Sequence, residues 1–304
     1  MPEYPDLTIY VEALERFAVD RVLLRVDLAS VSLLRSVEPP LSATHGRRVV
    51  GARRLAKRLV LELEGGLFLV LHLMVAGRLR WKKPGTRPPK RGGHACFQFE
   101  HGALLLTEAS TKKRATLHVV EGESGLAPHD PGGVEVMDLD LEGFRAVLAR
   151  ENHTLKRALT DPHLFAAIGN AYSDEILHRA RLSPVKWTSR LDDDESARLH
   201  AAVRETLGEW TERLRAEVGE GFPDRVTAFH DAMAVHGRHR EPCPVCGAPV
   251  QRIVYAENET HYCAPCQTGG KVLADRALSR LLKGDWPRSV EELERRRTTG
   301  SARG

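Results

Sequence analysis

The sequence predicts a mixed α+β protein: a β-sandwich-like N-terminal domain led by a helix, then a helical domain and a C-terminal ribbon that carries four cysteines. Short apolar runs separated by turn residues dominate residues 1–135, which is typical of strands joined by hairpins. Apolar residues further along the chain recur at helical spacing. Four of the five cysteines form two close pairs near the C-terminal end.

The N-terminal domain is expected to begin with an amphipathic helix. Asp6 is available as its N-cap, and the apolar residues that follow have a helical period: Leu7, Tyr10, Val11, Leu14 and Phe17. The expected strands then cover residues 59–63, 67–75, 95–99 and 103–106. The stretch 122–133, rich in glycine and proline, is the expected boundary of a domain formed by residues 1–135.

The second half of the chain favours helices. Apolar periodicity predicts them over residues 141–150, 154–159, 174–181 and 192–218. We therefore expect a helical domain over residues 136–236, a ribbon over 237–267 and an extension over 268–304. Within the extension, residues 271–283 resemble one more amphipathic helix.

The composition is that of a globular protein with a weak basic excess. The 304 residues are 42% hydrophobic, and 45 Lys+Arg against 41 Asp+Glu give a net charge of +4. That charge permits a polyanionic partner without requiring one. No run approaches the roughly 20 apolar residues of a membrane span, and the chain opens without a basic, apolar leader. We expect a soluble cytoplasmic protein.

The cysteine pairs point to a metal. Cys243, Cys246, Cys263 and Cys266 form a C-x2-C-x16-C-x2-C pattern, in which each pair can place two thiolates on one tetrahedral ion. Four sulfurs leave no open coordination position, so the pattern predicts one structural Zn²⁺. Four reduced core cysteines are the alternative, but the flanking residues are polar. Cys96, the fifth cysteine, is expected to be a core thiol.

The chain opens with Pro2 and Glu3. A small second residue allows removal of Met1, which would expose a secondary α-amino group. Because α-amino groups have a reference pKa near 7.7–8.0, much of such an amine is neutral and nucleophilic at working pH. Proline at position 2 is common, however, and taken alone it predicts no activity.

Four segments carry a family resemblance. They are the opening residues 1–6, the basic stretch 53–62, residues 168–177 and the approach 237–243 to the first cysteine. They are similar to the Met-Pro-Glu-x-Pro-Glu, Arg-Arg-x-x-Lys, Gly-Asn-x-Tyr-x-x-Glu-x-Leu and Gly-x-x-x-Glu-Pro-Cys motifs of the formamidopyrimidine-DNA glycosylase/endonuclease VIII family. The resemblance runs in order over residues 2–267, and it implies a helix-two-turn-helix within the helical domain.

The resemblance implies a monomeric base excision repair enzyme that removes damaged bases from double-stranded DNA and also cleaves abasic sites. The target nucleotide has to leave the base stack. Pro2 would then attack its C1′ and form a Schiff base, Glu3 would act as acid and base, and Lys57 would contact the phosphate beside the lesion. Strand cleavage by β-elimination would follow.

The same resemblance implies a set of DNA contacts. Asn170 opens the second helix of the helix-two-turn-helix, where backbone amides suit a phosphate. Lys156, His94 and Arg114 match DNA-contacting positions of the family.

Several residues depart from the family pattern. Asp6 replaces a glutamate, Asn258 stands where an arginine is associated with δ-elimination, and residues 107–116 lack the phenylalanine that fills the gap left by a flipped base. Met74 begins the sequence Met-Val-Ala-Gly and is not part of the Gly-Met-Ser-Gly motif of the family. These differences leave the preferred lesion and the second elimination open. The alternatives are a non-catalytic DNA-structure-binding protein and a glycosylase of the endonuclease VIII type that prefers oxidised pyrimidines.

Overall fold

The computed structural model describes residues 1–224, 226, 229–255, 258–274, 287, 289–290, 292 and 295. It separates into two compact units. The first contains residues 1–133 and 207–228, and the second contains residues 134–206 and 229–304. Helix α6 (Asp193–Val218) contributes to both, because its residues up to Thr206 belong to the second unit and those from Leu207 to the first.

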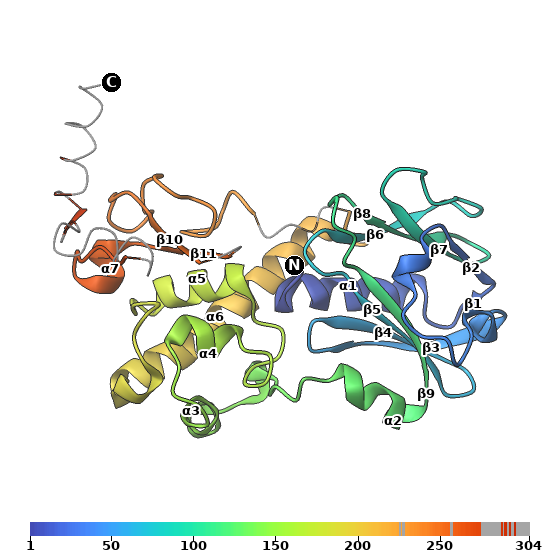
Figure 1. Ribbon diagram of the computed structural model, residues 1–304, viewed down its shortest axis with the longest axis horizontal. Coiled ribbons are helices and arrows are strands. Elements are labelled where there is room, and N and C mark those ends of the chain that lie inside the picture. The colour runs from blue at the N-terminus through green and yellow to red at the C-terminus, as the bar shows by residue number, and fades with distance from the viewer. Residues whose placement is uncertain are drawn as a thin grey trace. The chain divides into compact units, whose positions relative to one another are not determined.

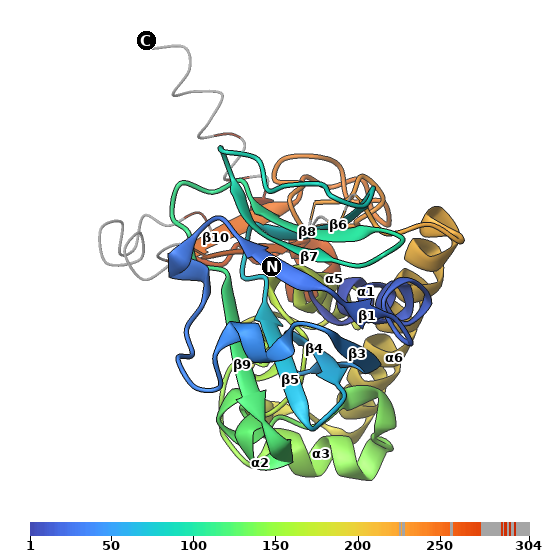
Figure 2. The ribbon, with the colours of Figure 1, turned by 90° about the vertical axis from the view of Figure 1, so that its right-hand side faces the viewer.

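The first unit contains two antiparallel sheets (Figure 1). The larger has the order β1-β3-β4-β5-β9, with the strands Val22–Leu23, Arg47–Leu55, Arg58–Leu63, Leu67–His72 and Thr116–Glu121. The smaller has the order β2-β7-β8-β6, with the strands Arg25–Leu28, Gly93–Gln98, Ala103–Glu108 and Gly77–Lys82. Figure 2 shows β4, β5 and β9 running side by side, as their antiparallel pairing requires. The short helix α2 (Gly122–Leu126) follows β9.

Helix α1 (Tyr4–Phe17) connects the two sheets of this unit. It packs on β3 and β4 of the larger sheet. From the smaller sheet, the Leu79 backbone N–H donates to the Tyr10 hydroxyl at 3.3 Å. Tyr10 and Leu14 are almost fully buried. This packing places the amino end of the chain in the interior of the first unit.

The second unit combines helices with a β-hairpin. Its further helices are α3 (Leu141–Ala149), α4 (Leu155–Thr160), α5 (Asn170–Arg179) and α7 (Ala264–Thr268), and its hairpin pairs β10 (Gln251–Tyr255) with β11 (Asn258–Tyr262). Helix α5 contacts α4, α7 and β11. The four-cysteine ribbon and the helical segment therefore pack together as one body.

The predicted α+β class is confirmed, including the leading helix and the four-cysteine ribbon. The predicted strands correspond to β4, β5, β7 and β8, and the predicted helices to α3, α4, α5 and α6. Sequence analysis did not assign β1, β2, β3, β6 and β9 to strands. The helix expected over residues 271–283 lies mostly outside the described residues. Across the part of the chain that the structure describes, no helix has the length and apolar character needed to span a bilayer.

Candidate functional site

The amino end of the chain forms the start of helix α1. Glu3, which is 2% exposed, is the N-cap of this helix, and its side chain accepts from the backbone N–H of Asp6. In return the Glu3 backbone N–H donates to Asp6 Oδ2 at 2.9 Å. This reciprocal capping box satisfies two backbone donors of the first turn. The prediction that Asp6 caps the helix was therefore wrong, because the helix begins earlier and Asp6 lies in its first turn.

Two cations and two carboxyl groups surround the amino group. Burial lowers the pKa of the Met1 amino group, Arg78 and Lys57 lower it further by charge repulsion, and Glu3 and Asp6 oppose them. Lys57 reaches this place from the turn between β3 and β4, where Ala56 has a φ of 49°. Pro2 is buried beside Glu3. The predicted Lys57 thus acts on the amino group that adjoins Pro2 and Glu3, and the structure adds Arg78, which sequence analysis did not propose for this site.

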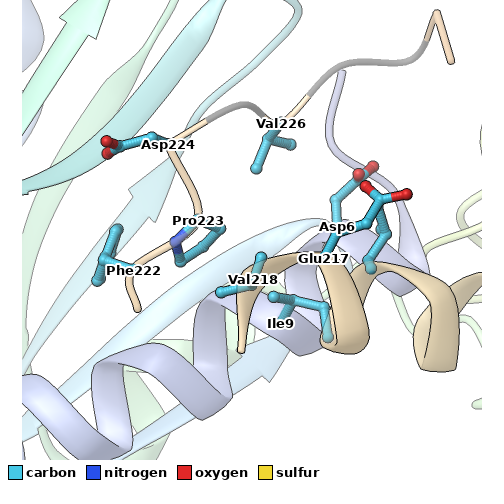
Figure 3. Close-up of a pocket in the computed structure, with 9 residues that line it drawn as sticks. Asp6, Ile9, Glu217, Val218, Phe222, Pro223, Asp224 and Val226 are labelled. Atoms are coloured by element: carbon cyan, nitrogen blue, oxygen red, sulfur yellow. The ribbon is translucent and has the colours of Figure 1, made fainter. Parts of the chain in front are cut away.

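Asp6 also lines a cavity of about 290 Å³ within the first unit (Figure 3). Apolar side chains and three carboxylates line the cavity: Asp6, Ile9, Leu214, Glu217, Val218, Phe222, Pro223, Asp224 and Val226. Burial raises the pKa of Asp6 to about 7. The Arg78 guanidinium donates from Nε to the Val226 carbonyl, which ties the segment after α6 to β6. Asp6 thus both lines the cavity and acts on the amino group.

His94 does not reach the surface. It is 1% exposed, and its Nε2 lies 3.0 Å from Oε2 of the equally buried Glu108. A direct DNA contact by this side chain would require the interior of the smaller sheet to open, so the expectation that His94 contacts DNA is not supported by its position. The carboxylate of Glu108 accepts from the backbone N–H of Arg114, which is itself exposed.

Lys156 also points inward. Its Nζ lies 2.5 Å from Oδ1 of Asp174 and donates to the Asn170 carbonyl at 2.6 Å, and its side chain is only 13% exposed. Burial alone raises the pKa of Asp174, but Lys156, His236 and His261 outweigh burial and hold that pKa below its usual range. Lys156 therefore supports the first turn of α5, where Asn170 lies, through a buried ion pair.

Two buried carboxylates of α5 organise the approach to the cysteines. Asp174 Oδ2 lies 2.8 Å from Nδ1 of His236 and accepts from the backbone N–H of His261 at 3.2 Å. Glu175 accepts from three consecutive backbone N–H groups, at Ala234, Val235 and His236. Buried carboxylates require such partners. The α5 segment was predicted to carry a family motif. Apart from Lys156, the groups that pair with its two carboxylates lie after α6 in the chain, at residues 234–236 and 261.

The four predicted metal ligands converge. The Sγ atoms of Cys243 and Cys266 are 4.0 Å apart, those of Cys246 and Cys263 are 3.3 Å apart, and all four lie within 4.8 Å of one another. Sulfurs at about 2.3 Å from a tetrahedral Zn²⁺ would be about 3.8 Å apart, so this arrangement fits such an ion. Nε2 of His178 lies 3.3 Å from Sγ of Cys243, as an outer partner of a thiolate would.

These features together define a class of protein: a two-sheet unit in which Pro2 is buried at the start of the leading helix, followed by a helical unit with a four-cysteine finger. Three family models match the chain in that order. They describe the formamidopyrimidine-DNA glycosylase N-terminal domain (residues 1–115), the formamidopyrimidine-DNA glycosylase H2TH domain (131–217) and a zinc finger found in FPG and IleRS (240–269).

Relatives and solved structures agree with these matches. The formamidopyrimidine-DNA glycosylase of Heliobacterium modesticaldum is 32% identical over 281 residues, which cover 88% of this chain and all of that protein. The crystal structure of the MutM (Fpg) protein of Thermus thermophilus has a TM-score of 0.73 at 31% identity, covering 88% of this chain and 98% of that one. The Lactococcus lactis Fpg bound to DNA containing N7-benzyl-Fapy-dG has a TM-score of 0.78 at 25% identity, covering 88% and 100%. The chain belongs to the formamidopyrimidine-DNA glycosylase/endonuclease VIII family of base excision repair glycosylases, as predicted.

Proposed function

We propose that this chain is a bifunctional DNA glycosylase and abasic-site lyase that uses the Pro2 amine as its nucleophile after Met1 is removed. The observation that carries the proposal is the burial of Pro2 and Glu3 at the start of α1, where burial, Arg78 and Lys57 lower the pKa of the adjoining Met1 amino group. Burial and neighbouring cations disfavour protonation of an amine. An amine held in this environment is neutral, and therefore nucleophilic, at lower pH than an exposed one.

The chemistry proceeds in two stages. The Pro2 nitrogen bonds to C1′ of a nucleotide that has left the base stack, and the glycosidic bond breaks as the base departs with its electron pair and gains a proton. After the nitrogen has lost its proton, its lone pair opens the C1′–O4′ bond, a proton is delivered to O4′, and an iminium ion is left. Loss of a C2′ proton then breaks the bond from C3′ to its phosphate oxygen, which is β-elimination. We assign these proton transfers to Glu3, which is buried next to Pro2.

The substrate is damaged duplex DNA that carries an oxidised or ring-opened base. The cavity lined by Asp6, Ile9 and Phe222 would hold such a base, because Asp6 also acts on the amino group. The DNA backbone would bind at the first turn of α5, where Asn170 lies, and on the ribbon hairpin. The δ-elimination stays outside the proposal, because Asn258 stands where the expected cation would be.

We further propose that the four cysteines hold one structural Zn²⁺. Cys243, Cys246, Cys263 and Cys266 complete its coordination, so the ion would stabilise the ribbon and take no part in the reaction. The residues that carry out the reaction all belong to the first unit.

Borohydride trapping tests the nucleophile. Purified protein from which Met1 has been removed is incubated with an abasic-site duplex and borohydride, which reduces a Schiff base to a stable amine. We expect a covalent complex, and mass spectrometry should locate the attached DNA on the N-terminal peptide. Pro2→Gly, which lacks the secondary amine and the ring that fixes its direction, should lose this complex. Absence of any adduct from the intact, processed protein would instead favour a non-catalytic DNA-structure-binding protein.

The pH dependence of trapping tests the role of Lys57. Trapping should rise with pH as the Pro2 amine loses its proton. In Lys57→Met, a cation that disfavours the protonated amine is gone, so the pKa of the amine rises and the midpoint of the curve moves to higher pH. Lys57→Arg keeps the charge and should restore the midpoint, even if its maximal rate differs. A midpoint that stays in place or moves to lower pH in Lys57→Met would show that Lys57 does not act on this amine.

A further inference from the structure

The segment 109–114, which connects β8 to β9, has an unusual composition. It contains three consecutive cations, Lys112, Lys113 and Arg114, and no acidic or aromatic residue. All three cations are exposed. This segment, called the cationic loop here, lies within residues 107–116, which lack the phenylalanine of the family pattern.

A buried carboxylate closes the cationic loop. Glu108, the last residue of β8, is 1% exposed, and its two oxygens accept from the Arg114 backbone N–H at 3.0 and 3.1 Å. Oε2 also accepts from the Ala115 N–H at 3.3 Å. The Lys113 ammonium donates to the Glu108 backbone carbonyl at 2.5 Å. Both ends of the loop are thereby held at one residue.

His94 completes this arrangement from the neighbouring strand. It lies in β7 at the irregularity between Gly93 and Ala95, and its Nε2 is 3.0 Å from Glu108 Oε2. The two side chains are each 1% exposed. A carboxylate removed from water is costly unless it is hydrogen-bonded. The Glu108 carboxylate therefore favours the one loop conformation that brings the Arg114 and Ala115 amides to it.

We propose that Glu108 is a positioning residue that holds the cationic loop in a shape preformed to bind phosphates of the DNA substrate. The proposal rests on the proposed function and deepens it: this enzyme engages the DNA around the lesion with fixed positive charge in place of an inserted aromatic ring. His94 acts through Glu108 and makes no contact with DNA.

The direction in which one substitution changes the DNA affinity distinguishes this role from simple charge attraction. Glu108→Gln removes a negative charge, which by Coulomb attraction alone would strengthen binding to DNA. If Glu108 positions the loop, the same substitution weakens binding instead, because a neutral amide oxygen holds the Arg114 and Ala115 amides less well. Glu123→Gln on α2 is the matched control, since it removes an exposed carboxylate of the same unit that pairs with Arg53.

The experiment measures equilibrium binding to a duplex with a stable abasic-site analogue, at several salt concentrations. Glu108→Gln should weaken binding about tenfold and reduce the slope of log K against log salt by about 0.9 for each phosphate that the loop no longer neutralises. Glu123→Gln should leave the slope unchanged. Tighter binding by Glu108→Gln, or an unchanged slope, would overturn the proposal.

A combined variant, Lys112→Met with Lys113→Met and Arg114→Met, completes a mutant cycle. Glu108→Gln should add little to its defect, because both changes remove the same interactions with phosphate. Full additivity would contradict the proposal. Hydrogen exchange of the native protein gives an answer even if Glu108→Gln does not fold: the Arg114 and Ala115 amides should be protected, and exchange as fast as in an open loop would overturn the assignment. Because the cycle measures binding alone, a failed borohydride trap would refute the nucleophile without deciding the role of the loop.

Discussion

Glu3→Gln is expected to slow base excision by about 10²–10⁴-fold, the range in which a positioned acid or base contributes to catalysis. Glutamine cannot supply the proton that the departing base or the opening sugar requires. The substitution leaves the helix start intact, because the glutamine side-chain oxygen can still accept from the Asp6 backbone N–H. The defect would therefore come from the chemistry and not from a displaced Pro2.

Single-turnover excision from a duplex with one oxidised base measures this effect. Borohydride trapping on an abasic site should decline much less, since no base has to leave there. Glu15→Gln, an exposed position on the same helix, is the matched control and should retain the native rate. Excision within a few-fold of native in Glu3→Gln would assign the proton transfer to another group, of which Asp6, with its pKa near 7, is the nearest by structure.

Cys263→Ser is expected to release the metal and unfold the ribbon. Structural Zn²⁺ contributes apparent binding energies of about 10–16 kcal/mol in zinc-finger peptides, which is comparable with the whole stability of a domain, about 5–15 kcal/mol. Cys263 is fully buried and its backbone N–H donates to Gln267, so no solvent-facing arrangement can replace it. DNA affinity should fall with the ribbon.

Elemental analysis should give one zinc per native chain and none in Cys263→Ser, and limited proteolysis should cut the variant within residues 237–267. Cys96→Ser is the matched control, because Cys96 is a buried cysteine of β7 outside the cluster. It should keep its zinc. A Cys263→Ser protein that retains both stoichiometric zinc and a resistant ribbon would show that the four sulfurs do not form one site.

The parts of the site that depend on local sequence were predictable. The spacing of the cysteine pairs brings two thiolates together within each turn, and the structure confirms that Cys243, Cys246, Cys263 and Cys266 converge. The capping residues at the start of α1 are likewise neighbours in sequence. The helix was predicted, but its N-cap is Glu3 and not Asp6. Strand β6 was missed because Arg78, Arg80 and Lys82 alternate with its apolar residues, so the strand contains no continuous apolar run.

Burial could not be predicted for the charged residues. His94 and Lys156 were expected to contact DNA. In the structure His94 pairs with the buried Glu108, and Lys156 pairs with the buried Asp174. Each pair joins two elements, β7 with β8 and α4 with α5. Whether a charged side chain faces water or a buried partner depends on that packing.

The amino acid sequence by itself determined the family and the four-cysteine cluster, and it predicted Pro2 and Glu3 as catalytic residues. It could do so because motifs and close spacings extend over only a few residues. Only the tertiary structure decided what else lies near them: Arg78, which acts on the amino group, and Glu108 beneath the cationic loop. These groups come from different strands and turns. Their electric fields and hydrogen bonds act through space, so they exist only once the sheets have packed.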